Sequence, residues 1–72
     1  MVEVKSLDGI TLYVSLSPDA DFKTYGYYYE IFLDENMAEL YDYGNTYDQD
    51  EDSSWEWICN IAERIEVHPK YI

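Results

Sequence analysis

The segment TYDQDEDSSWEW, residues 46–57, holds five acidic side chains and two tryptophans. Asp48, Asp50 and Asp52 have the spacing of positions 1, 3 and 5 of an EF-hand calcium loop. In that alignment the glycine position is occupied by Ser53, and the position of the bidentate glutamate is occupied by Cys59. The segment is therefore not predicted to bind calcium as an EF-hand.

The same segment has the residues of a helix start. Ser53 followed three residues later by Glu56 is the pattern of a capping box. Acidic residues at this end also favour the positive end of the helix dipole. Capping accounts for Ser53, Glu56 and Asp52, whereas the other three acids of the segment lie farther out and require another explanation.

Acidic residues dominate a much longer part of the chain. Sixteen acidic and four basic residues give a formal charge of −12. The forty residues between Lys23 and Arg64 contain eleven acids and neither lysine nor arginine, whereas ordinary surfaces mix both signs. Adaptation to high salt produces the same bias. The charge argues against direct binding to nucleic acid or to an anionic membrane and favours a basic partner protein.

Residue types that carry catalysis are few. Cys59 is expected to be a small buried hydrophobe, and His68 has no second histidine or further cysteine with which to form a zinc site. Ser53 and Ser54 are explained by capping, and the three glycines form no phosphate-binding loop. No carboxylate lies in a pattern that indicates a raised pKa in a cleft. We therefore expect a protein that is not an enzyme and binds no metal or cofactor.

Alternation of apolar and polar residues predicts the first two strands. ITLYVSLS, residues 10–17, places its apolar side chains on one face: Ile10, Leu12, Val14 and Leu16. VEVKSL alternates in the same way, and Asp8-Gly9 is expected to join the two strands as a two-residue hairpin turn. Residues 17–21 are predicted to form a loop.

The middle of the chain predicts two more strands. Residues 25–34, YGYYYEIFLD, favour a strand with four side chains on one face: Tyr27, Tyr29, Ile31 and Leu33. After a turn at 34–36, residues 37–43 are predicted as a fourth strand. A short helix that Asp34 caps is the alternative. Residues 44–52 are expected to form a polar loop.

The last predicted element is an amphipathic helix over residues 54–66, which His68-Pro69 would end. Its expected apolar face comprises Trp55, Trp57, Ile58, Ile61, Ala62 and Ile65. The chain is thus predicted to be one α+β domain over residues 1–72. A small antiparallel sheet of three to four strands would carry one C-terminal amphipathic helix on one face. A single cysteine and no signal-like segment favour a cytoplasmic protein.

Tyrosines and acids together indicate a surface for protein binding. Four of the nine tyrosines, at 25 and 27–29, occupy both faces of one predicted strand, so we expect some to face solvent. Exposed tyrosines among carboxylates suit a groove lined with lysine and arginine. The predicted partner-binding residues are Glu30, Asp34, Glu35, Glu39, Tyr41, Asp42, Tyr43, Tyr47, Asp48, Asp50, Glu51 and Asp52.

In length, charge, tyrosine content and layout, the chain resembles the acidic inhibitors that phages and mobile elements encode. These include anti-CRISPR proteins, anti-restriction proteins and uracil-DNA glycosylase inhibitors that mimic DNA. The resemblance is one of class and implies an inhibitor of a CRISPR effector or related DNA-binding enzyme, with carboxylates in place of phosphates. Two alternatives stay open: an immunity protein or antitoxin that neutralises a basic nuclease, and a homodimeric structural domain with a solvated acidic face.

Overall fold

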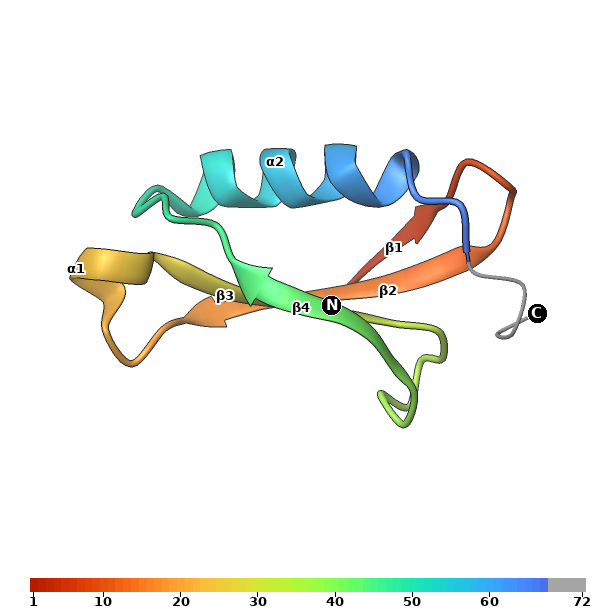
Figure 1. Cartoon of the computed structure of the whole chain (residues 1–72), viewed down its shortest axis with the longest axis horizontal. Coiled ribbons are helices and arrows are strands. Elements are labelled where there is room, and N and C mark those ends of the chain that lie inside the picture. Colours follow the sequence, from red (N-terminus) through yellow and green to blue (C-terminus); the bar gives the residue numbers. More distant parts are fainter. Residues whose placement is uncertain (68–72) are drawn as a thin grey trace.

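The computed structural model describes residues 1–67 and has two layers, a four-stranded antiparallel sheet and one long helix lying across it (Figure 1). The strands lie side by side in the order of the sequence. The predicted α+β fold is confirmed, and the fourth strand replaces the helix alternative. The elements are β1 (Val2–Lys5), β2 (Thr11–Pro18), α1 (Phe22–Tyr25), β3 (Tyr27–Phe32), β4 (Leu40–Asn45) and α2 (Glu51–Glu63).

The hydrophobic core lies between the sheet and α2. Cross-strand pairing places Val4 beside Leu12, and Val14 beside Ile31. These four side chains are buried together with Ile58 and Ala62 of α2 and with Val67. Because side chains alternate along a strand, one apolar face on each of β1, β2 and β3 is enough to build this layer. The predicted inward faces of the second and third strands are thus confirmed.

The turn between β1 and β2 differs from the prediction. The amide of Gly9 donates to the carbonyl of Ser6, and Gly9 has a φ of +81°, so the connection has three residues in place of two. The carboxylate of Asp8 accepts hydrogen bonds from the Ser6 hydroxyl and, at 3.1 Å, from the amide of Val67. The turn therefore holds the segment that follows α2.

Three elements begin or end away from their predicted bounds. β4 covers Leu40–Asn45 in place of the predicted 37–43, so its last two residues belong to the strand and not to the polar loop expected over 44–52. Residues 22–25 form the short helix α1, so the third strand begins at Tyr27 and not at Tyr25. α2 begins at Glu51 and ends at Glu63, three residues earlier than predicted at each end. It ends there because the next residues bind the β1–β2 turn, where the Leu7 amide donates to the Ile65 carbonyl. The predicted stop at His68-Pro69 lies outside the described residues.

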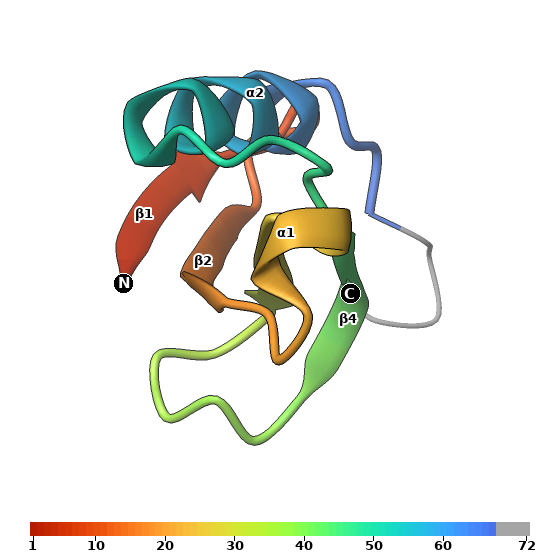
Figure 2. The same cartoon turned by 90° about the vertical axis from the view of Figure 1, so that its left-hand side faces the viewer.

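α2 covers only one face of the sheet. Figure 2 shows the helix above the strands and the β3–β4 loop, residues 33–39, on the opposite side. β4 is an edge strand with a register shift beside Ile31 and Phe32. Among residues 1–67, no helix is long and apolar enough to cross a membrane. The architecture thus leaves one sheet face without a covering helix, and β1 and β4 are the two edge strands.

Candidate functional site

The sheet face away from α2, here called the tyrosine face, carries aromatic and acidic side chains in adjacent rows. One row pairs Glu3 with Tyr13, and the next pairs Glu30 with Tyr43. Tyr28 lies in the following row, and its ring centroid is 6.4 Å from that of Tyr43. Tyr43 is 62% exposed. The face therefore presents the Tyr43 ring to solvent. Of the four tyrosines for which exposure was predicted, Tyr25 is exposed and those at 27–29 are half-buried.

Carboxylates surround the tyrosine hydroxyls on this face. Partial burial raises the pKa of Tyr13, and the negative charges of Glu3, Glu35 and Asp34 raise it further. Partial burial and the charge of Glu30 likewise raise the pKa of Tyr28. Acids of β1 and the β3–β4 loop thus lie near the Tyr13 ring, and Glu30 of β3 lies near the Tyr28 ring, which makes this surface both aromatic and negative.

The twelve predicted partner-binding residues are divided between two ends of β4. At one end, Glu30 and Tyr43 lie on the tyrosine face, and the β3–β4 loop brings the acids at 34 and 35 near Tyr13. Glu39 was predicted to lie in the fourth strand, but it precedes β4. At the other end lie the β4–α2 loop and the first turn of α2, with Tyr47, Asp48, Asp50, Glu51 and Asp52.

Three of these residues, in β4 and the β3–β4 loop, have structural hydrogen bonds. Asp34 holds the β3–β4 loop, because its Oδ1 accepts from the amides of Ala38 and Glu39 at 3.0 and 2.9 Å. Tyr41 packs against the core, and its hydroxyl donates to the Glu66 carbonyl at 3.4 Å. Asp42 accepts from the Tyr43 amide at 2.9 Å. Substitution of these three would alter the fold as well as the surface.

The β4–α2 loop is fixed from below by a close backbone contact. Gly26 has a φ of +70°, and a Cβ atom there would lie 2.3 Å from the carbonyl oxygen of Asp48. Above this contact, the buried Ser54 hydroxyl donates to the same carbonyl at 3.2 Å and lies 2.9 Å from the Thr46 hydroxyl. The position of Asp48 is thus determined by Gly26 on one side and by α2 on the other.

The predicted capping box at Ser53 and Glu56 is wrong, because the N-cap of α2 is Asp50. Oδ2 of Asp50 accepts from the Ser53 amide at 2.8 Å, and Glu51 and Asp52 occupy the first turn. Oδ1 of Asp48 in turn accepts from the Asp50 amide at 2.9 Å. Acids that the sequence left unexplained therefore form the helix start.

Replacement of Asp50 by alanine should destabilise the fold at pH 7, because the Ser53 amide loses its side-chain acceptor at the N-cap of α2. The hydrogen bonds from Ser53 lower the pKa of Asp50 below its ordinary value of 3.8. The folded state therefore binds this proton less readily than the unfolded state. The difference between wild type and Asp50→Ala should be complete above pH 4 and should shrink as the pH falls through the lowered pKa.

Urea denaturation at pH 7 and pH 3 measures that difference. Asp52→Ala is the matched control, since Asp52 is exposed in the same turn but is not the capping residue. It should cost only a few tenths of a kcal/mol through the helix dipole. Equal losses in the two variants would show that the Asp50 cap is not the stabilising feature.

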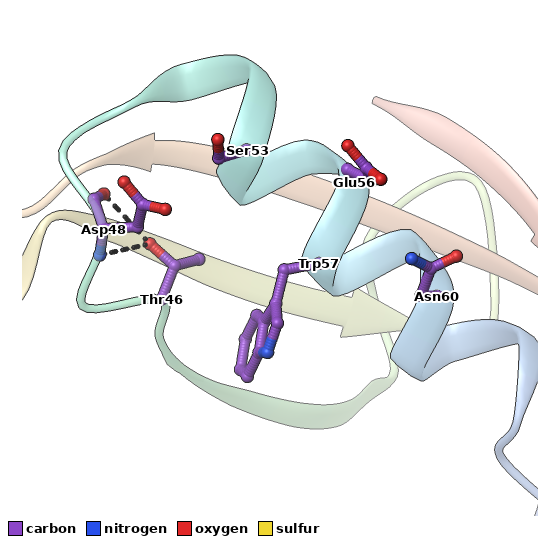
Figure 3. A pocket seen from close by; sticks show the side chains of 6 residues that line it. All are labelled: Thr46, Asp48, Ser53, Glu56, Trp57 and Asn60. Carbon is purple, nitrogen blue, oxygen red and sulfur yellow. Dashed lines mark hydrogen bonds between the residues drawn. The ribbon is translucent and has the colours of Figure 1, made fainter.

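An open pocket of about 350 Å³ lies between α2 and the β4–α2 loop (Figure 3). On α2 a stripe with helical spacing lines it, from Ser53 through Glu56 and Trp57 to Asn60. Thr46 and Asp48 line the loop side. The pocket thus contains two carboxylates and one indole, and none of its six lining residues is basic.

Aromatic side chains support the wall of this pocket. The Trp57 ring lies edge-on to Tyr29, with centroids 6.0 Å apart, and Trp57 is 44% exposed.

Tyr47, in the β4–α2 loop, is 71% exposed and has a φ of +57°, which is strained for a bulky residue. Its amide donates to the Tyr25 carbonyl at 3.0 Å. Such strain at an exposed ring is often found at binding sites.

The pocket includes residues that the sequence interpretation missed. Trp57 was expected on the apolar helix face, but it lies on the flank, and Glu56 and Asn60 were assigned only to the solvent face. The sequence did contain a sign of this pocket, because Glu56, Trp57 and Asn60 form one helical stripe that combines an indole with carboxylate and amide side chains.

Cys59 is partly buried against the core, where desolvation and Glu63 raise the pKa of its thiol. Within residues 1–67, no His, Cys, Asp or Glu side chains are grouped to hold a metal ion.

Comparison of the chain with protein-family models, with curated proteins and with solved structures finds no match. Its function must therefore be inferred from the surfaces themselves.

Proposed function

We propose that this chain is a protein inhibitor that occupies the nucleic-acid-binding groove of a basic protein. The carrying observation is the tyrosine face, where the exposed Tyr43 and the half-buried Tyr13 and Tyr28 lie among carboxylates of three different elements. Tyrosine gives large contact area at low entropic cost, and its face attracts cationic side chains. The carboxylates would meet lysine and arginine where phosphates otherwise lie.

The dimensions of the chain suit this proposal. It is 37 Å long, with cross-sectional extents of 21 and 17 Å, and carries a formal charge of −12. A chain of this charge and size presents a dense negative surface to a groove that otherwise attracts phosphates. A CRISPR effector, or another DNA-binding enzyme directed against phages, is the proposed target. An immunity protein against a basic nuclease would use the same surface.

The test is capture of partners on the immobilised chain from nuclease-treated cell lysate, followed by competition. We expect one nucleic-acid-binding protein to be retained and then released both by salt and by added nucleic acid. Its affinity should fall roughly tenfold or more between about 50 and 200 mM salt, because opposite charges are screened. Release by salt alone, without competition by nucleic acid, would contradict binding in the groove.

A homodimeric domain is the second candidate, favoured by the uncovered sheet face with Leu40 and Tyr43 exposed on β4. It predicts a different result in the same experiment. The chain would then capture only itself, and light scattering would give a dimer mass that does not change with salt. Charge opposes this arrangement, since two tyrosine faces would bring Glu3, Glu30 and Glu35 of both copies together.

A further inference from the structure

We propose that the pocket at Trp57 receives a single arginine side chain from the basic partner. This inference rests on the proposed function for the identity of its ligand. It concerns a different surface, because the pocket lies on the α2 side of the sheet and the tyrosine face lies on the other. A groove that encloses the chain would contact both.

The size of the pocket limits what it can hold. At about 350 Å³ it lies at the lower end of the range for ligand sites, and it is open on one side. One long side chain that enters from solvent fits this space. A second protein element would need a longer groove. The pocket is therefore suited to one anchoring residue.

The charges around the pocket select a cation. Asp48 and Glu56 line opposite sides, and both are exposed. Oδ1 of Asp48 is engaged by the Asp50 amide, whereas no hydrogen bond to its Oδ2 is found within residues 1–67. The helix start does not offer an anion site here, because the amides of Ser53 and Ser54 already donate to Asp50.

The indole selects arginine among cations. The Trp57 side chain points from α2 towards the sheet in Figure 3, and it lines the same pocket as Thr46 and Asp48. Its edge-on contact with Tyr29 holds the ring in place. A guanidinium group is planar, stacks on aromatic faces and donates several hydrogen bonds at fixed angles. Asp48, Glu56 and the Asn60 amide provide acceptors for those donors.

The pocket can be tested without the partner, by an NMR titration of the whole chain with N-acetylarginine amide. We expect saturable shifts of the Trp57 indole N–H and of the backbone amides of Asp48 and Asn60. A dissociation constant on the order of millimolar is expected for one side chain. The neutral isostere N-acetylcitrulline amide should bind at least about tenfold more weakly, because it lacks the positive charge.

Three variants make the test specific. Trp57→Leu keeps an apolar cover over Tyr29 but removes the indole, and it should weaken binding about tenfold with the remaining spectrum preserved. Glu56→Gln should weaken binding several-fold. Glu63→Gln removes the same charge on α2 outside the pocket and should leave binding unchanged.

Non-saturating shifts spread over the acidic surface would overturn the inference, as would equal effects of Glu56→Gln and Glu63→Gln. A failed titration together with successful partner capture would disprove the pocket and leave the proposed function standing. Saturable arginine binding without any captured partner would support the pocket and count against the proposed function.

Discussion

Gly26→Ala should be the most destabilising single-methyl change in this chain outside its core, with a loss of roughly 2–5 kcal/mol in the free energy of unfolding. Two costs combine. The backbone of Gly26 has a φ of +70° and a ψ of −119°, a conformation that side-chain-bearing residues rarely adopt. The new Cβ would also lie 2.3 Å from the Asp48 carbonyl oxygen and 2.7 Å from its nitrogen. Both are backbone atoms, so no side-chain rotation can relieve the contact.

The consequence should extend to the pocket. Displacement of Asp48 would break the hydrogen bond from the Ser54 hydroxyl at 3.2 Å and would move the Asp50 cap. A domain of this size has only a few kcal/mol of net stability, so a substantial unfolded fraction is expected. Urea denaturation, followed by tryptophan fluorescence, measures the loss.

Gly9→Ala is the matched control for that substitution. Gly9 also has a positive φ, +81°, but its Cβ would meet no atom within 4 Å. It should therefore lose only about 1–2 kcal/mol from backbone strain. If the two alanine variants lose the same stability, the contact between Gly26 and Asp48 does not constrain the loop.

The strands could be predicted because one face of the sheet is covered by a single helix. Along residues 10–17 this covering requires an apolar side chain at every second position, with Leu12 and Val14 fully buried. The same reasoning separated Tyr29 and Ile31 from Tyr28 and Glu30, as the pairing confirms. The alternation of apolar and polar residues was sufficient to predict a strand wherever every second side chain is buried.

The start of α2 could not be predicted from local sequence. Residues 48–54 offer several good N-caps, and tertiary contacts decide between them. Ser54 is buried and bonds to the β4–α2 loop, so it lies inside the helix, and Asp50 becomes the cap. The predicted cap at Ser53 missed this because the β4–α2 loop is held in place by Gly26, which is distant in sequence.

Trp57 was misplaced for a related reason. A helical wheel assigns it to the apolar face, but α2 packs mainly on β1, β2 and β3. Its flank towards β4 is therefore left open, and the indole forms a pocket wall in place of core. The width of the covered face depends on the position of the helix over the sheet, which the sequence of the helix does not contain.

The second large effect is expected from reversal of charge at Glu35 and Glu39. Both are exposed acids at the β3–β4 end, and neither carboxylate has a hydrogen bond within the described residues. Glu35→Lys with Glu39→Lys should weaken partner binding about 30- to 100-fold, because each change replaces an attraction by a repulsion. Stability should be unchanged or higher, since the variant relieves repulsion in a chain of charge −12.

Glu63→Lys with Glu66→Lys changes the net charge equally at the far end of α2. Long-range steering depends on total charge, so both double variants should slow association to a similar extent. Only Glu35→Lys with Glu39→Lys should also speed dissociation, because only its carboxylates lie at the tyrosine face.

Reversal at Asp48, Asp50 and Glu51 would not separate these effects, since Asp50 caps α2 and its loss destabilises the fold. Equal dissociation rates for the two double variants would place the binding surface elsewhere. The comparison thus distinguishes a specific acidic surface from the effect of net charge alone.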